Sequence, residues 1–167
     1  RLRDLLKGGK WHEADKETYE VMIRAVGKKS GDWFSSKELL NFPCTDLRTI
    51  DRLWVKYSQG KFGFSVQKKI YVECGARMDG EYPGDKIWHE FCNRVGWRND
   101  GKLLNSSDLQ ANSSLSTTGK LPRVQSTLLS MPGSNWSELE FRGSVPAGRG
   151  WVSSLAQRLV KCGTSQS

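Results

Sequence analysis

Residues 41–58 read NFPCTDLRTIDRLWVKYS, and their apolar side chains recur every three or four positions. The repeating face consists of Leu47, Ile50, Trp54 and Tyr57. This spacing places the four side chains on one side of an α-helix, so it predicts an amphipathic helix that faces a core. We expect Thr45 or Asp46 to cap the start of the helix and Gly60 to end it at the C′ position, because these residue types favour those positions.

The chain before this helix shows the same periodicity. Residues 1–6 open in a helical pattern, and residues 11–25 repeat small or apolar side chains at spacings of three and four. A short helical turn follows through residues 39–40, where Ser35 or Ser36 can act as the cap. We therefore predict that the chain is helical on both sides of a connection near residues 26–35.

Three more helices are predicted beyond residue 60. Ser65 can cap the first of them, although the alternation of Phe62, Phe64 and Val66 leaves a short strand open as a second interpretation. Gly84 and Asp85 open the next helix, and the last one spans about residues 151–161. The sequence predicts an all-α fold, a compact irregular helical bundle with a long irregular loop before its last helix.

Length and charge restrict the domain plan and the partner. The 167 residues carry a formal net charge of +8, and residues 101–167 hold seven basic and three acidic residues, half of that excess. We expect one domain, with a helical core at 1–104, a long loop at 105–150, a terminal helix at 151–162 and a tail at 163–167. An irregular segment as long as 105–150 is either disordered or functional. Because residues 101–167 hold half of the excess charge, an anionic partner is expected beside it. No dense Lys/Arg stripe is expected elsewhere.

The cysteines and histidines offer little chemistry. The four cysteines are widely spaced without a C-x-x-C motif, which favours free, mostly buried thiols in a reducing compartment. Cys44 as an axial metal ligand is the weaker alternative to a core thiol. Phosphate-binding and zinc-protease motifs are missing, and for Asp46 and Asp51 we favour capping and ion pairing over catalysis. The pattern predicts a protein that is not an enzyme.

Residues 41–58 also carry a family resemblance. Together with GKFGFSVQK at residues 60–68, RDLL at 3–6 and VGWR at 95–98, they resemble the genomes-uncoupled-four family. The terminal segment from residue 151 to residue 162 fits the same pattern. A joint motif of this length is much more specific than any short catalytic signature, and it covers most of residues 1–104 plus the last helix.

The resemblance implies a cupped, helical porphyrin-binding core. Members bind protoporphyrin IX and magnesium protoporphyrin IX, with no bound metal of their own, and they activate magnesium chelatase through its large porphyrin-binding subunit. The resemblance further implies a role in chlorophyll biosynthesis and plastid-to-nucleus (retrograde) signalling, and a monomer in the chloroplast stroma, partly associated with the thylakoid or envelope membranes. The chain begins at Arg1, and we expect a mature or excised fragment without its targeting segment.

Two loops are expected to form the apolar wall of the palm, one near residues 28–42 and the other within residues 115–150. A porphyrin is a flat apolar disc with two carboxylates at one edge, so it needs aromatic and aliphatic walls and a few cations. Arg142 and Arg149 are candidates for holding the carboxylates, because guanidinium matches their planar geometry. The candidate walls are Trp33, Leu39, Phe42, Leu121, Leu128, Met131, Trp136, Phe141 and Trp151.

The net charge supports one alternative function. A chain with a charge of +8 and several tryptophans in or beside loops also fits a basic module that binds nucleic acid or another anionic surface. We favour the porphyrin, and expect no nucleic-acid partner, because the excess charge lies beside the irregular, aromatic-bearing third of the chain. DNA binding that falls steeply with salt, without a change in a porphyrin spectrum, would favour the alternative.

Overall fold

The computed structural model describes residues 1–104, 117–123 and 149–163. Four helices make up the first part of the chain, α1 (Leu2–Lys7), α2 (Trp11–Ala25), α3 (Ser36–Leu40) and α4 (Cys44–Tyr57). Two more helices follow, α5 (Phe64–Glu73) and α6 (Asp85–Arg94), and then a small hairpin of β1 (Arg98–Asn99) and β2 (Lys102–Leu103). The last helix of the described part is α9 (Arg149–Lys161). The predicted all-α class is confirmed.

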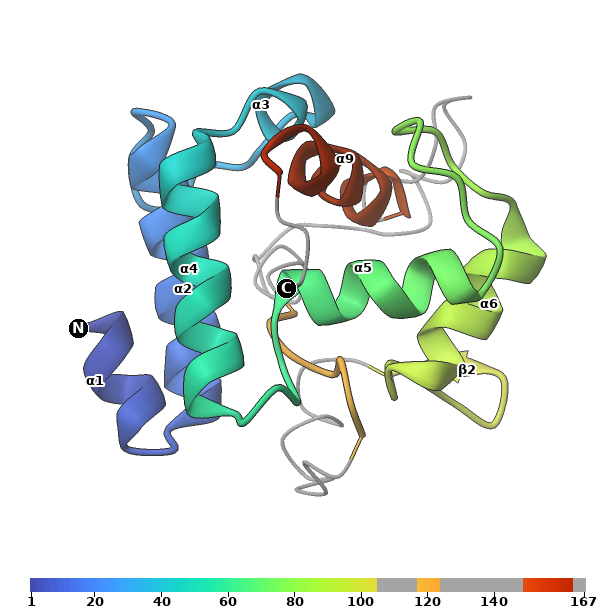
Figure 1. Ribbon diagram of the computed structural model, residues 1–167, viewed down its shortest axis with the longest axis horizontal. Helices are drawn as coiled ribbons and strands as arrows, with labels where there is room; N and C mark the ends of the chain where they lie inside the picture. The colour runs from blue at the N-terminus through green and yellow to red at the C-terminus, as the bar shows by residue number, and fades with distance from the viewer. Residues whose placement is uncertain (105–116, 124–148, 164–167) are drawn as a thin grey trace.

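Helix α9 joins two hydrophobic clusters. The first cluster is formed mainly by α1, α2 and α4, and the second by α5, α6 and the residues that follow α6. Leu155 and Leu159 of α9 belong to the first cluster, whereas Val152 and Ala156 belong to the second. In Figure 1, α2 and α4 run side by side, α5 runs across their direction, and α9 lies between α3 and α5. The terminal helix therefore ties the two halves of the core together.

Helix α4 buries the face that its sequence predicts. Leu47, Ile50 and Trp54 are buried in the first cluster, and Tyr57 is half-buried at its edge. The indole Nε1 of Trp54 donates a hydrogen bond of 2.9 Å to the hydroxyl of Thr18 on α2. Because the buried indole has a partner, it packs into the core without the cost of an unpaired donor.

The ends of α4 differ from the prediction by one or two residues. The helix begins at Cys44, with Pro43 at the N-cap and no side-chain cap, so the expected cap at Thr45 or Asp46 is wrong. Proline suits this boundary, because the helix starts before an N–H at that position is needed. At the other end, Gln59 adopts the left-handed conformation with φ of 55°, and the N–H of Gly60 donates to the carbonyl of Val55. This is a Schellman ending in which Gly60 takes the C″ position and not C′.

Of the other local predictions, one is confirmed and two are wrong. Ser35 is confirmed as the cap of α3, where it forms a full capping box with Glu38. The strand alternative around Phe64 is wrong, because α5 begins there with Gly63 at its N-cap. The expected cap at Ser65 is also wrong, since the backbone N–H of Ser65 instead donates to a carboxylate oxygen of Asp51, at 2.8 Å. An acid from the preceding helix therefore satisfies the start of α5.

The cysteine interpretation needs the largest correction. Cys44 and Cys162 form a disulfide with a Cα–Cα distance of 5.3 Å, so these two are not free thiols. Cys74 and Cys92 take no part in a disulfide. The alternative of Cys44 as an axial metal ligand is also wrong in this state, because its sulfur is already bonded. Sequence spacing alone does not pair cysteines that lie 118 residues apart.

A short part of the predicted loop 105–150 belongs to the core. Residues 119–123 are buried, and the side chain of Gln67 on α5 donates to the carbonyls of Gly119 and Pro122, at 2.9 and 2.8 Å. The N–H of Gly63 donates to the carbonyl of Leu121, at 3.0 Å. These bonds fasten residues 119–123 across the start of α5, between the two clusters.

Candidate functional site

Trp33 is the most exposed of the large apolar side chains in the described part of the chain, with 65% of its surface accessible. It lies in the connection between α2 and α3, one residue before the buried Phe34. Leaving an indole of this size in water is unfavourable compared with burying it. A tryptophan held outward in an ordered segment is therefore a candidate for contact with a flat apolar ligand.

Two hydrogen bonds hold the backbone of residues 32–34, which we call the Trp33 segment, in place. The hydroxyl of Tyr19 on α2 donates to the carbonyl of Asp32, at 2.6 Å, and Lys28 donates to the carbonyl of Trp33, at 2.7 Å. Burial, followed by the nearby charges of Glu20 and Asp32, raises the pKa of Tyr19 to about 12, so its hydroxyl keeps its proton at neutral pH. The backbone around Trp33 is thus fastened while its side chain remains free.

Phe34 and Glu38 continue this anchoring toward α3. The ring of Phe34 packs edge-on against Tyr19 and Phe42, with centroid distances of 5.7 and 6.4 Å. Glu38 receives a hydrogen bond from Lys28, which is the main reason why its pKa falls to about 2, and the bonds from Ser35 lower it further. Glu38 is therefore ionised at neutral pH and links Lys28 to the start of α3.

Three other predicted wall residues are part of the core. Leu39 and Phe42 are 0% exposed, and Leu121 is 6% exposed, all within the first cluster. In this conformation Phe42 packs against Phe34, and Leu39 and Phe42 present no surface of their own. The sequence could not separate these roles, because apolar residues that line a ligand and apolar residues that fill a core have the same composition.

The remaining predicted residues cannot be placed by their side chains. Arg149 and Trp151 lie in the first turn of α9, but their side chains belong to the part that the structure does not describe. The other five lie outside the described residues altogether: Leu128, Met131, Trp136, Phe141 and Arg142. Their assignment to the ligand remains a prediction.

The position of α9 is fixed against α3, the helix that follows the Trp33 segment. Helix α9 packs against α3, and Arg158 donates to the carbonyl of Phe42, at 2.6 Å. On the opposite side, the hydroxyls of Tyr71 and Ser153 lie 2.6 Å apart in a buried hydrogen bond. The Cys44–Cys162 disulfide fastens the C-terminal end of the helix. Because of these contacts, the first turn of α9 is held in a defined place relative to α3.

Arg123 is a buried cation that the sequence interpretation missed. It is 4% exposed, its guanidinium carbon lies 5.4 Å from the ring centre of Trp97, and within the described part its Nε and Nη1 have no hydrogen-bond partner. Burial lowers its pKa to about 10, against the opposing effect of Asp15, so it remains charged at neutral pH. No sequence signal distinguishes it, since the pattern around Pro122 resembles any turn.

A hollow beside α5 has the wrong lining for an apolar disc. It has a volume of about 350 Å³ and lies between α5, the end of α6 and residue 118. Its lining is rich in charge, with Lys69 and an ion pair between Glu73 and Arg94. A porphyrin ring needs mostly apolar walls, so this hollow is a poor candidate for it. The described residues also contain no group of three or more side chains that could hold a metal ion.

Membrane-spanning helices are not found in the part of the chain that the structure describes, because none of these helices is both long and apolar enough.

Comparisons with known proteins agree with the helical architecture. The structure is similar to that of GUN4 from Chlamydomonas reinhardtii, with a TM-score of 0.60 and 26% identity, over 93% of this chain and 85% of the other. The ligand-free structure of Arabidopsis thaliana GUN4 gives a TM-score of 0.58 at 22% identity, over 93% and 88% of the two chains. The second likeness concerns the fold alone, because its sequence identity is low.

Curated relatives cover part of the chain. A protein of Arabidopsis thaliana named tetrapyrrole-binding protein, chloroplastic, is 33% identical over 114 residues, which is 66% of this chain and 38% of the relative. The ycf53 protein of Porphyra purpurea is 36% identical over 86 residues, 50% of this chain and 32% of the relative. The chain thus spans roughly a third of the length of these relatives. A family model described as GUN4-like matches residues 1–138, and the chain therefore belongs to the GUN4-like family.

Proposed function

We propose that this chain is a non-catalytic tetrapyrrole-binding protein, which holds its ligand between the Trp33 segment and the residues before α9. The observation that carries the proposal is the anchored, outward-facing indole of Trp33, 65% exposed, in a chain of the GUN4-like family. A relative in Arabidopsis thaliana is named for tetrapyrrole binding, which supports the same ligand class.

The chemistry of the ligand fits this arrangement. One face of a flat ring stacks on Trp33, and the second wall comes from the apolar residues within 115–150 and the first turn of α9. Arg142 and Arg149 are proposed to hold the two carboxylates, because a guanidinium can donate two parallel hydrogen bonds to each. Micromolar affinity requires about 8 kcal/mol net, after the cost of ordering and association is met.

The finer functional assignments rest on the family resemblance. We propose protoporphyrin IX and magnesium protoporphyrin IX as ligands, and the large subunit of magnesium chelatase as the protein partner. In this role the chain acts as a monomer in the plastid, stimulates chelation in chlorophyll biosynthesis and participates in plastid-to-nucleus signalling. A plastid location is supported by the chloroplastic relative. Any association with thylakoid or envelope membranes is peripheral in this proposal.

A porphyrin titration tests the ligand class directly. Adding deuteroporphyrin or protoporphyrin IX to the folded protein should shift the Soret band to the red and quench tryptophan fluorescence. A flat titration with folded protein would contradict the proposal. Arg142→Ala and Arg149→Ala should each weaken binding, whereas Arg3→Ala on the exposed surface of α1 is a matched control that should not. If both loop variants bind normally, the carboxylate assignment is wrong.

Chelatase assays test the accessory role. The chain added to the chelatase subunits should raise the rate of magnesium insertion, and it should insert no magnesium when the subunits are omitted. Chelation by the chain alone would overturn the view that it is not an enzyme.

A further inference from the structure

The segment from Arg48 to Lys69 contains six basic residues and a single acidic one, Asp51. Asp51 is 6% exposed and accepts a hydrogen bond from the N–H of Ser65, so it contributes little to the surface. The excess charge is therefore not confined to the last third of the chain. The expectation that no dense Lys/Arg stripe exists elsewhere was wrong, because the sequence does not reveal that the intervening acid is buried.

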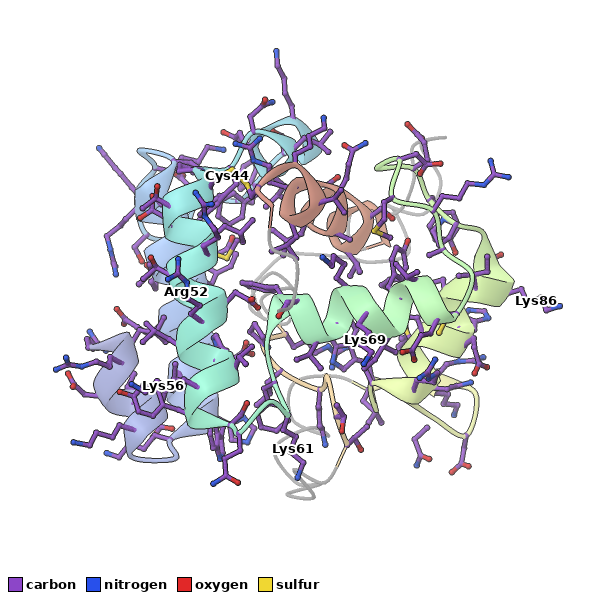
Figure 2. All side chains as sticks on the ribbon, viewed as in Figure 1. Cys44, Arg52, Lys56, Lys61, Lys69 and Lys86 are labelled. Carbon is purple, nitrogen blue, oxygen red and sulfur yellow. A yellow bond between two sulfur atoms is a disulfide. The ribbon has the colours of Figure 1, made fainter. Side chains whose placement is uncertain are left out.

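Five of these six bases, all except Lys68, gather on one side of the molecule. Arg48, Arg52 and Lys56 follow one another at intervals of four residues on α4, which separates them by about 6 Å along the helix axis. Lys61 follows in the turn after α4, and Lys69 lies on α5. Figure 2 shows the labelled members on the same side, with Arg52 and Lys56 along α4, Lys61 at the turn and Lys69 on α5. We call these five residues the α4–α5 basic face.

Most of this charge is not compensated. The ion pairs found between described residues involve other bases, such as Arg24, Lys28 and Arg94, and none involves Arg52, Lys56, Lys61 or Lys69. Like charges spaced four residues apart on a helix destabilise it. A row of unpaired cations that opposes folding is most simply explained by a partner that neutralises it.

The inner members of the face are also held in position. Arg48 donates to the carbonyls of Cys44 and Cys162, at 3.3 and 3.2 Å, so its guanidinium is ordered near the disulfide. The ammonium of Lys56 lies 5.6 Å from the ring centre of Tyr57, a half-buried aromatic at the edge of the face. Arginine and tyrosine are enriched at protein interfaces, because they offer large contact area together with polar groups.

We propose that the α4–α5 basic face docks onto an acidic surface of a protein partner. This inference rests on the proposed function, in which that partner is the large subunit of magnesium chelatase. The face fits a protein better than a membrane, because surface binding to lipid uses inserted apolar side chains beside the cations. Among the described large apolar residues that are exposed, only Val72 lies on α4 or α5. The α4–α5 basic face also fits single-stranded nucleic acid poorly, since no exposed aromatic side chain for base stacking lies on it.

Charge reversal with a matched control tests this docking. The face variant carries Arg52→Glu, Lys56→Glu and Lys61→Glu. The control variant carries Lys16→Glu, Lys86→Glu and Lys102→Glu, three exposed lysines on α2, α6 and β2, and it changes the net charge equally. Lys86 lies on α6, away from the face, in Figure 2. A second face variant with glutamine at the same three positions serves if the reversed chain does not fold.

Binding to the purified large subunit is measured by surface plasmon resonance at several salt concentrations. The face variant should bind about tenfold more weakly or worse and lose most of the salt dependence, whereas the control variant should bind like the wild type. Both variants should keep the porphyrin titration of the wild type, because the face and Trp33 lie on different elements.

The other outcomes separate the inference from the proposed function. Equal losses in both variants, or no loss in the face variant, would overturn the docking face. A wild type that binds porphyrin but not the large subunit would remove the proposed partner, and a flat porphyrin titration would remove the ligand. Phosphatidylglycerol vesicles and duplex DNA are tested in parallel. Binding to either one that depends on the face, without an effect on the protein partner, would overturn the protein assignment.

Discussion

Cys162, at the end of α9, is bonded to Cys44, the first residue of α4, which lies 118 residues earlier in the chain. The carbonyl of Cys162 also accepts a hydrogen bond from Arg48, one turn into α4. The C-terminal end of α9 is thus fastened to the start of α4. The segment proposed to cover the tetrapyrrole is anchored at both ends, by residues 119–123 and by α9.

Loss of this disulfide should reduce the stability of the fold. Closing a loop of this size restricts the unfolded chain, and a native disulfide typically contributes about 2–4 kcal/mol. We expect Cys162→Ser to lower the free energy of unfolding by this amount, and a reductant to have the same effect on the wild type. Urea denaturation with and without dithiothreitol measures both.

The free cysteine Cys74 supplies the control for that measurement. Cys74→Ser should leave the response to reductant as it is in the wild type, because Cys74 takes no part in a disulfide. A wild-type unfolding midpoint that does not move with reductant would show that the disulfide adds nothing to stability.

Gly63 and Gly60 should respond differently to alanine, although they share the turn between α4 and α5. A Cβ on Gly63, at φ of 141°, would lie 2.8 Å from Val55 and 3.0 Å from the carboxylate of Asp51, whereas one on Gly60, at φ of 79°, would meet nothing within 4 Å. Gly60→Ala should cost about 1 kcal/mol for its backbone conformation alone. Gly63→Ala should cost a further 1–3 kcal/mol or so, because the clash adds to the strain. Equal losses in thermal denaturation would contradict the close packing at Gly63.

Asp51 should make the stability of the protein depend on pH. Burial raises the pKa of its carboxyl above the ordinary value of 3.8, against the hydrogen bonds from Ser65 and Phe64, which lower it. A raised pKa in the folded state means that its contribution to stability is present at low pH and is lost as pH rises through the folded pKa. Asp51→Asn stays neutral, so the stability of this variant relative to the wild type should increase from about pH 4 to pH 7.

Denaturation at a series of pH values measures this difference. Asp46→Asn removes an exposed carboxylate of the same helix and serves as the matched variant. If the stability of Asp51→Asn relative to the wild type stays constant or falls with rising pH, burial does not destabilise the ionised form of Asp51.

The helices were predictable because their signals are local. The apolar periodicity of Leu47, Ile50 and Trp54 needs only 3.6 residues per turn and a core on one side, and the structure confirms it. The cap at Ser35, one of the two residues expected there, depends on groups within four residues, and it too is confirmed. Local signals were not always sufficient, because the expected caps at Thr45 or Asp46 and at Ser65 were wrong.

The features that the sequence missed depend on distant partners. Cys44 was interpreted as a free thiol because its partner lies 118 residues away, and Asp51 was assigned to capping or ion pairing without a partner, although it completes the start of the next helix. Arg123 went unnoticed because its burial under Trp97 is a tertiary property. Leu39 and Phe42 were assigned to a ligand wall, whereas both are buried in the first cluster. Burial, and not composition, separates these cases.

That separation can be tested at the proposed ligand site with Trp33→Ala and Leu39→Ala. Trp33 is 65% exposed, so its removal should change the free energy of unfolding by less than about 0.5 kcal/mol. Porphyrin affinity should fall by about five- to tenfold, since aromatic stacking contributes about 1 kcal/mol or somewhat more beyond buried area.

Leu39 is fully buried, so Leu39→Ala should cost about 2–5 kcal/mol of stability. Its folded fraction should nevertheless bind porphyrin like the wild type. Fluorescence titration and urea denaturation of both variants separate the two effects, and Trp33→Phe should restore most of the affinity. If Trp33→Ala binds porphyrin normally, the exposed indole is not the stacking surface, and the ligand must be held by residues 115–150 and α9 without it.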